Sequence, residues 1–264
     1  MSEFRNAKNN VYDDPVFFKN YRRLRQNDTG LNGILEIPAL RALLPCLKHK
    51  QVLDLGSGFG DFARYARQGG AASVTGIELS EKMFTEAQKL TNDPHIRYLH
   101  GSMTCLPAVL KNFDIVVSSL AIHYVADFTA LANDIYTRLQ PGGYFVFSVE
   151  HPMCTAFSSS YQKDEHGRFV CMPVDNYQDE SRRLTHWFVD DVVKYHRTVQ
   201  SYVTALLDAG FELRALQEPK FRRRGWTFVP KQTYLTVMRR FYYSAPASRG
   251  SREMVSEPGH SCAA

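Results

Sequence analysis

Residues 51–60, QVLDLGSGFG, place one carboxylate and three glycines where a predicted strand meets a predicted helix. An apolar run that contains Asp54 leads directly into Gly56, Gly58 and Gly60. Glycine tolerates the backbone angles of a tight turn, and a backbone without Cβ atoms lets a ligand come close. The helix that follows would direct unpaired N–H groups and a partial positive charge at the turn. The pattern therefore predicts a site for a nucleotide-like ligand.

Two details separate this turn from a dinucleotide site. The pattern G-x-G-x-x-G has its third glycine one residue later, where this chain carries Asp61. Asp54 would repel a pyrophosphate, whereas it would attract the ammonium group of an amino acid. These residues disfavour NAD and favour S-adenosylmethionine (SAM).

A second carboxylate, Glu78, lies at the end of the next predicted strand. It stands 78 − 56 = 22 positions after Gly56. A carboxylate there can accept hydrogen bonds from both hydroxyls of a ribose, more strongly than a neutral side chain would. The alternative is a solvated acid at a strand end, and the upstream glycine turn favours the ribose role.

Strand and helix patterns alternate around these residues, which is typical of an α/β fold with a parallel sheet. Right-handed crossovers would gather the ligand residues at the carboxyl ends of the strands. The predicted strands are 52–55, 73–77, 96–99, 113–118 and 144–149, and the helices between them are 61–68, 80–90 and 128–139.

The flanking segments are expected to complete and cover this core. Helices at 15–25 and 33–44 could form a lid, the aromatic-rich segment 151–194 a cap, and a helix at 195–209 with strands at 211–216 and 233–238 an antiparallel ending. The expected divisions are 1–45 (lid), 46–150 (core), 151–194 (cap), 195–243 (completion of the sheet) and 244–264 (disordered tail).

Composition sets broad limits on function. The chain has 264 residues, 44% of them hydrophobic, and suits one α/β domain with a cap. It has no apolar run of ~20 residues and no apolar signal region, so a soluble cytoplasmic protein without a membrane partner is expected. Five scattered cysteines lack C-x-x-C spacing, which predicts reduced thiols and no metal site. The net charge of +5 and the run at 222–224 favour a solvated turn over a nucleic-acid face. The oligomeric state is left open.

QVLDLGSGFG and GIELS resemble motifs I and II of the class I SAM-dependent methyltransferases, in particular the type 11 and type 25 groups. The resemblance covers roughly residues 40–150. It implies a Rossmann-like fold with a mostly parallel seven-stranded sheet, an antiparallel C-terminal strand and an inserted cap, and it implies SAM as cofactor.

The resemblance also implies roles for individual residues. It assigns Glu78 to the ribose and Tyr21 with Arg25 to the methionine end. Ser102 and Met103 stand where this family often has an aspartate beside the adenine. The cofactor residues so predicted are Tyr21, Arg25, Asp54, Gly56, Ser57, Gly58, Gly60, Glu78, Leu79, Met83, Ser102, Met103 and Ser119.

Two histidines follow predicted strands at the edge where a methyl group would point. His123 lies in SSLAIHYV and His151 in SVEHPM. A neutral imidazole can accept a proton near pH 7, so either could act as a general base; packing against the adenosine is the alternative for His123. Aromatic and histidine side chains could enclose an acceptor, although core packing explains each of them as well: Tyr124, His186, Trp187, Tyr195 and His196.

The predicted function is methyl transfer from SAM to an oxygen or nitrogen atom of a small molecule. An RNA or protein methyltransferase of the same fold is the nearest alternative, although no N-P-P-Y sequence follows the fourth strand. An NAD-dependent oxidoreductase and a SAM-binding protein without catalysis are further alternatives.

Overall fold

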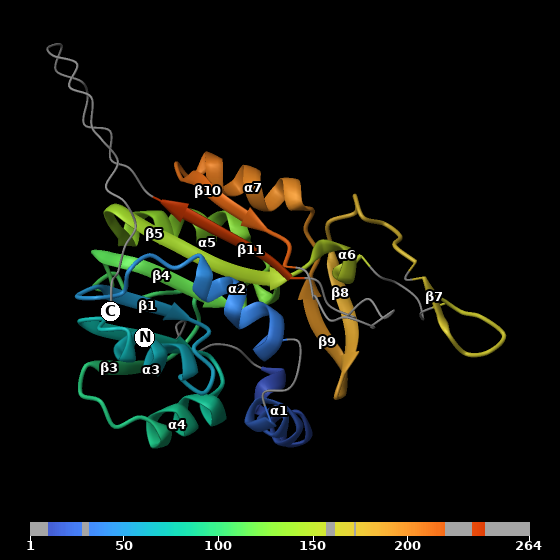
Figure 1. The fold of residues 1–264 in the computed structure, drawn as a ribbon, viewed down its shortest axis with the longest axis horizontal. Helices are drawn as coiled ribbons and strands as arrows, with labels where there is room; N and C mark the ends of the chain where they lie inside the picture. The colour runs from blue at the N-terminus through green and yellow to red at the C-terminus, as the bar shows by residue number, and fades with distance from the viewer. Residues whose placement is uncertain (1–9, 28–31, 157–161, 172, 220–233, 241–264) are drawn as a thin grey trace, which may run out of the picture.

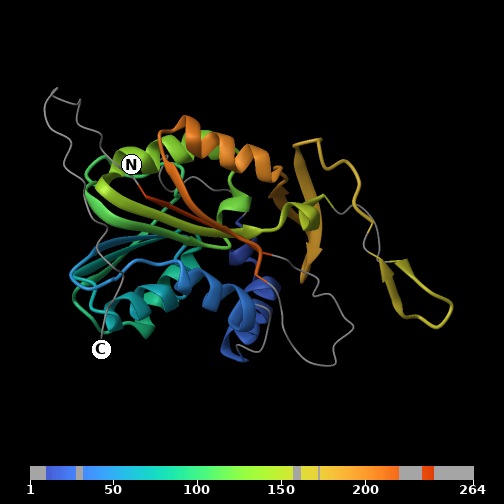
Figure 2. The ribbon, with the colours of Figure 1, turned by 45° about the horizontal axis from the view of Figure 1, so that its top comes forward.

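A seven-stranded sheet forms the centre of the computed structural model, with helices on both faces (Figures 1 and 2). The structure describes residues 10–27, 32–156, 162–171, 173–219 and 234–240. The strand order is β10-β11-β5-β4-β1-β2-β3. Its strands are β1 (Gln51–Leu55), β2 (Ser73–Glu78), β3 (Ile96–His100), β4 (Phe113–Ser119), β5 (Leu139–Glu150), β10 (Glu212–Gln217) and β11 (Tyr234–Arg240).

Five neighbouring strands, β5, β4, β1, β2 and β3, run parallel, and β11 pairs antiparallel with both β5 and β10. The parallel core and the antiparallel C-terminal strand predicted from the sequence are therefore confirmed. Helices α5 (Phe128–Arg138) and α7 (Val199–Asp208) cover one face of the sheet, while α2 (Ile37–Ala42), α3 (Asp61–Gln68) and α4 (Glu81–Leu90) cover the other (Figure 2).

Side-chain alternation along β1 decides where its carboxylate points. Leu53 and Leu55 pack into the apolar cluster under α5 and α7, whereas Val52 packs into the cluster under α2, α3 and α4. Because successive residues of a strand face opposite sides, Asp54 shares the face of Val52. Asp54 is buried there, at the carboxyl end of the strand.

The remaining elements lie at the carboxyl ends of the strands (Figure 1). The N-terminal part comprises a short 3-10 turn, η2 (Val11–Asp13), helix α1 (Pro15–Asn27) and a π-helical turn, η3 (Asn32–Glu36), which leads into α2. The segment predicted as a cap contains α6 (Pro152–Thr155) and two hairpins, β6 (Gln162–Lys163) with β7 (Phe169–Cys171) and β8 (Arg182–Trp187) with β9 (Val189–Tyr195). A second 3-10 turn, η4 (Ile122–Tyr124), follows β4.

Several element boundaries differ from the sequence prediction, and the largest shifts lie next to α7 and β5. The helix expected from residue 195 begins at Val199, since Thr198 caps it and Tyr195 still pairs with Arg182 in the hairpin. Three valines favour a strand in the preceding segment, at positions 189, 192 and 193. The helix expected to reach residue 139 ends at Arg138, and β5 begins at Leu139.

Several expectations concern other parts of the chain. The basic run at 222–224 and the tail from 244 lie outside the described residues. Cys105, Cys154 and Cys171 form no disulfide, as predicted, whereas Cys46 is disulfide-bonded, which contradicts the prediction of reduced thiols at that position. Within the described ranges, no helix is both long and apolar enough to cross a bilayer.

A buried ion pair joins the β8–β9 hairpin to the sheet. Lys194 Nζ on β9 donates to Glu150 Oε2 at the end of β5, over 2.6 Å, and both side chains are almost fully buried. The pair fixes the hairpin beside the carboxyl ends of the strands, where ligands bind in this class of sheet.

Removing the cation of this pair should destabilise the fold. Lys194→Met leaves Glu150 buried without its partner, and we expect the free energy of unfolding to fall by about 3–5 kcal/mol. Urea denaturation measures the change. The matched control, Glu150→Gln with Lys194→Met, should recover most of the loss because no buried charge remains. A free energy of unfolding for Lys194→Met alone that lies within 1 kcal/mol of the wild type would contradict a stabilising role for this ion pair.

Candidate functional site

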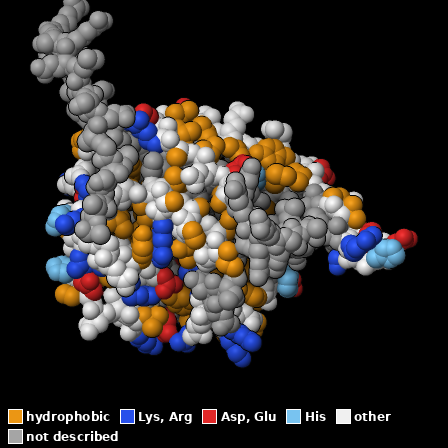
Figure 3. Space-filling model, in the orientation of Figure 1, with side chains coloured by type: hydrophobic (Ala, Val, Ile, Leu, Met, Phe, Trp, Pro, Cys, Tyr) orange, Lys and Arg blue, Asp and Glu red, His pale blue; other side chains and the backbone are white. Residues whose placement is uncertain are grey.

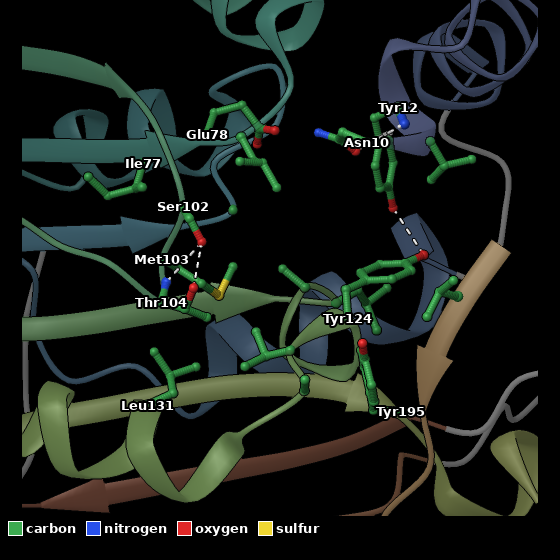
Figure 4. A pocket seen from close by; sticks show the side chains of 18 of the residues that line it. Asn10, Tyr12, Ile77, Glu78, Ser102, Met103, Thr104, Tyr124, Leu131 and Tyr195 are labelled. Atoms are coloured by element: carbon green, nitrogen blue, oxygen red, sulfur yellow. Dashed lines mark hydrogen bonds between the residues drawn. The ribbon is translucent and has the colours of Figure 1, made fainter. Parts of the chain in front are cut away.

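A cavity of about 840 Å³ opens at the carboxyl ends of the parallel strands. Figure 4 shows Tyr12, Tyr124 and Tyr195 on one side of it and residues from the ends of β2 and β3 on the other. The volume lies in the range of small-molecule sites. The lining residues predicted from the sequence are Tyr21, Gly56, Gly58, Glu78, Leu79, Met83, Ser102, Met103, Ser119, Tyr124 and Tyr195.

The glycine turn has the backbone geometry that its sequence indicates. Gly56, Gly58 and Gly60 have positive φ angles of 75°, 54° and 78°, which other residues adopt only with strain. A Cβ on Gly56 would lie 2.5 Å from the Cβ of Ala121, so the close packing beside β4 requires glycine. Gly60 lines no described cavity; it precedes α3, and a Cβ there would collide with the hydroxyl of Tyr98.

Glu78 connects this turn to the start of α4. Its Oε2 accepts a hydrogen bond from Gly58 N, and its Oε1 accepts one from Ser80 N, each over 2.8 Å. Burial raises the pKa of Glu78 to about 6, although these backbone donors oppose the shift. The carboxylate lies in the wall of the cavity (Figure 4) and retains acceptor capacity for a ligand hydroxyl.

A second cavity, of about 80 Å³, lies on the other side of the glycine turn. Asp54 and Ser57 line it, and their Asp54 Oδ2 and Ser57 Oγ atoms are buried without a hydrogen-bond partner. Burial, together with the negative charges of Glu78 and Asp61, raises the pKa of Asp54 to about 8. A buried carboxylate oxygen without a partner is costly, and an ammonium group would supply the missing donor and charge.

The same small cavity also contains positive charge. Arg25 and Arg41 line it; Arg25 pairs with Asp61 over 3.2 Å, and the Arg41 guanidinium stacks on the ring of Tyr65. Acid and base side chains therefore face one narrow space, which suits a ligand with both an ammonium group and a carboxylate.

The two cavities share five lining residues, and we call this shared boundary the junction: Tyr21, Gly56, Gly58, Ser119 and Leu120. Leu120 has a left-handed backbone, with φ of 49°, which is strained for a leucine. Its N–H lies 3.1 Å from both the carbonyl oxygen and the Oγ of Ser148 on β5, and these contacts hold the strained turn. A ligand that joins an amino acid to a nucleoside would pass through the junction.

The two histidines predicted as bases do not line either cavity. His123 is buried, and its Nδ1 accepts a hydrogen bond from Glu150 N over 3.4 Å. Burial, followed by the charges of Lys194 and Arg197, lowers the pKa of His123 well below its ordinary value. His151 bonds Glu218 Oε1 through Nε2 over 2.7 Å and accepts from Met153 N through Nδ1. This geometry gives neither imidazole a route to a ligand in the described cavities.

The predicted acceptor residues divide into two groups. Tyr124 and Tyr195 line the large cavity, whereas His186, Trp187 and His196 do not. His186 is exposed and bonds Asp190, and both ring nitrogens of His196 are engaged, with Thr155 and the carbonyl of Tyr177. Trp187 packs edge-on against Phe17 and Tyr21 of α1, so it supports the cavity wall from behind.

Sequence reasoning missed the N-terminal wall of the large cavity, formed by residues 10–12. Tyr12 donates from its hydroxyl to that of Tyr124 over 3.1 Å. Asp13 anchors this wall, because its Oδ1 accepts from Ser80 Oγ over 2.7 Å and from Lys82 N over 3.1 Å, while Lys82 Nζ donates to its carbonyl oxygen. The signal in the sequence was Asp13, an acid that directly precedes the Asp14-Pro15 helix start. Arg182 and Asp191 on the β8–β9 hairpin were missed as well.

Comparisons with known proteins bear on the family and the fold of this chain. Residues 53–147 match the methyltransferase domain family. A crystal structure of a candidate SAM-dependent methyltransferase from Listeria monocytogenes has 37% identity and a TM-score of 0.73, covering 79% of this chain and 98% of that one. A SAM-dependent methyltransferase from Mesorhizobium loti has 35% identity and a TM-score of 0.69, covering 81% and 99%.

A relative with a named reaction matches a shorter part of the chain. The malonyl-[acyl-carrier protein] O-methyltransferase of Enterobacter lignolyticus is 34% identical over 110 residues, which is 42% of this chain and 43% of that protein.

Binding of SAM, through its ammonium group, should depend on pH through Asp54. Below pH about 8 this carboxyl group holds a proton in the free protein, and an ammonium ligand favours its ionised form. Binding then releases a proton, so affinity should rise with pH, by up to about tenfold per unit, and level off above pH 8. Calorimetry between pH 6.5 and 8.5 measures this.

Two variants assign the effect. Asp54→Asn should bind weakly and without this pH dependence, whereas Glu78→Gln, whose acid titrates lower, should keep it. A wild-type affinity that is constant over the range would contradict the role of Asp54.

Proposed function

The chain belongs to the SAM-dependent methyltransferases, and from this membership we propose that it transfers the methyl group of SAM to an oxygen or nitrogen atom of a small-molecule acceptor. The observation that carries the proposal is the pair of cavities that meet at the glycine turn. One is narrow and contains an unpartnered acid, and the other has room beyond a nucleoside.

The chain's residues fit the cofactor part by part. Asp54 and Ser57 offer unpartnered acceptors to its ammonium group, and Arg25 lies where it can pair with its carboxylate. Glu78 offers its carboxylate to the ribose, and Met83 and Met103 supply apolar surface for the adenine. Bound SAM supplies an electrophilic methyl group, and the protein's task is to align an acceptor atom with it while excluding water.

The rest of the large cavity supports a small acceptor. Its wall is built from Tyr12, Tyr124 and Tyr195, whose rings give apolar surface and whose hydroxyls give polar contacts. Arg182 is the one basic side chain among the lining residues of this cavity that the structure describes. The relative from Enterobacter lignolyticus is named as an O-methyltransferase, which favours oxygen as the first acceptor atom to test.

An RNA or protein methyltransferase of the same fold remains the second candidate. Its substrate would need an open, strongly basic approach to the cavity. On the face seen in Figure 3, lysine and arginine side chains are scattered among acidic and apolar ones, which gives this alternative less support.

Methyl-labelled SAM with a panel of organic acids, phenols, amines, bulk RNA and bulk protein tests the proposal. We expect label in a small molecule together with stoichiometric S-adenosylhomocysteine. Label in RNA or protein alone would overturn the acceptor class, and failure to bind SAM would overturn the proposal altogether.

Arg182 should contribute to the binding of anionic acceptors from this panel. Arg182→Ala removes a charged donor from the cavity wall, so we expect KM for such an acceptor to rise about tenfold while S-adenosylhomocysteine affinity stays the same. Steady-state kinetics and calorimetry measure the two quantities. Arg168→Ala, in the exposed turn between β6 and β7, is the matched control. An unchanged KM would remove Arg182 from the site.

A further inference from the structure

Glu36 is a carboxyl group with no exposed surface, placed between the N-terminal helices and the strand ends. It ends the π-helical turn η3, a rare geometry that is frequent at functional sites. Its Oε1 accepts a hydrogen bond from Ser119 Oγ, over 2.9 Å, and another from Ser148 Oγ. Ser119 is the last residue of β4, and Ser148 lies on β5 beside it.

The two serines differ in what they reach. Ser119 lines both cavities and therefore lies at the junction, whereas Ser148 lines neither. Ser119 thus connects the hidden carboxyl group to the place where the amino-acid and nucleoside parts of SAM would join. That place is where the sulfur and its methyl group belong. Ser148 makes the same bond to Glu36 without that access.

The groups around Glu36 leave it able to change its protonation state. Burial raises its pKa, whereas hydrogen bonds from Ser148 and Ser119 and the charges of Arg25 on α1 and Arg41 on α2 lower it, and the net shift is upward. Tyr21 on α1 also faces it. A carboxylate with a raised pKa accepts a proton more readily at neutral pH than an exposed one does.

We propose that Glu36 holds the proton that the acceptor loses, and that Ser119 is the catalytic hydroxyl that passes it on. The proposal rests on the proposed function. In the step, the acceptor atom forms a bond to the methyl carbon, and the sulfur–carbon bond breaks with its electron pair remaining on sulfur. The acceptor's proton goes to Ser119 Oγ, and the proton of Ser119 goes to Glu36 Oε1. No further reactant is needed.

This arrangement keeps the charge of the junction balanced. Before transfer a positive sulfonium would face an ionised Glu36, and afterwards a neutral thioether would face a protonated one. Opposite charges in a shielded site stabilise each other strongly, so the protonation of Glu36 should follow the charge on sulfur. The complex with SAM should hold Glu36 ionised, and the complex with S-adenosylhomocysteine should hold it protonated.

Calorimetric titrations with SAM and S-adenosylhomocysteine between pH 5 and 8.5, at each pH in two effective buffers of different ionisation enthalpy, test this without any acceptor. The buffer dependence of the heat gives the protons exchanged. Effects of Asp54 and Glu78 cancel in the comparison, because both ligands carry the same ammonium group and ribose. We expect S-adenosylhomocysteine to take up more protons than SAM, by as much as one at the pH of largest difference.

Variants separate proton transfer from structural support. Glu36→Gln should abolish the difference in proton uptake between the two ligands. It should also weaken the binding of SAM relative to that of S-adenosylhomocysteine by about tenfold. Ser119→Ala should reduce the difference, and Ser148→Ala, the matched control, should keep it. Thermal unfolding checks that each variant is folded. The comparison of SAM with S-adenosylhomocysteine on the wild-type protein does not depend on any variant.

Equal proton exchange for the two wild-type complexes, or a difference that survives in Glu36→Gln, would overturn the inference. If neither ligand bound the wild type, the proposed function itself would fail and the inference with it.

Discussion

The desolvation of Asp54 is the interaction on which the arrangement of this protein depends. The acid is the next-to-last residue of β1, the middle one of the five parallel strands, and α2 and α3 cover its side of the sheet. Keeping a carboxyl group there without a partner on Oδ2 costs free energy, which the apolar packing of both sheet faces offsets. A small cation attached to a larger ligand would fit this narrow cavity beside the glycine turn.

Much of this could be predicted from local patterns, because the parallel core follows from alternating strand and helix signals and the turn follows from three glycines. The direction in which each side chain points after the end of a strand could not be predicted in this way. His123 and Tyr124 are neighbours in the short turn η4, yet only Tyr124 lines the cavity. A sequence indicates that both follow β4, but the rotation of one residue decides which of them meets a ligand.

The parts that were missed are long-range contacts. Glu36 has no motif, and it becomes a candidate only because the fold brings it to Ser119, 83 positions later in the chain. The N-terminal wall was likewise hidden, since Tyr12 meets Tyr124 across 112 positions. Such pairs are set by how the N-terminal segments dock onto the carboxyl ends of the strands.

The anchoring of Asp13 to Ser80 and Lys82 supports the cavity wall from residues that lie outside its lining. These bonds join the wall formed by residues 10–12 to the first turn of α4, two residues beyond Glu78. Because Asp13, Ser80 and Lys82 do not line the cavity, a substitution at any of them would loosen this wall without removing a lining residue.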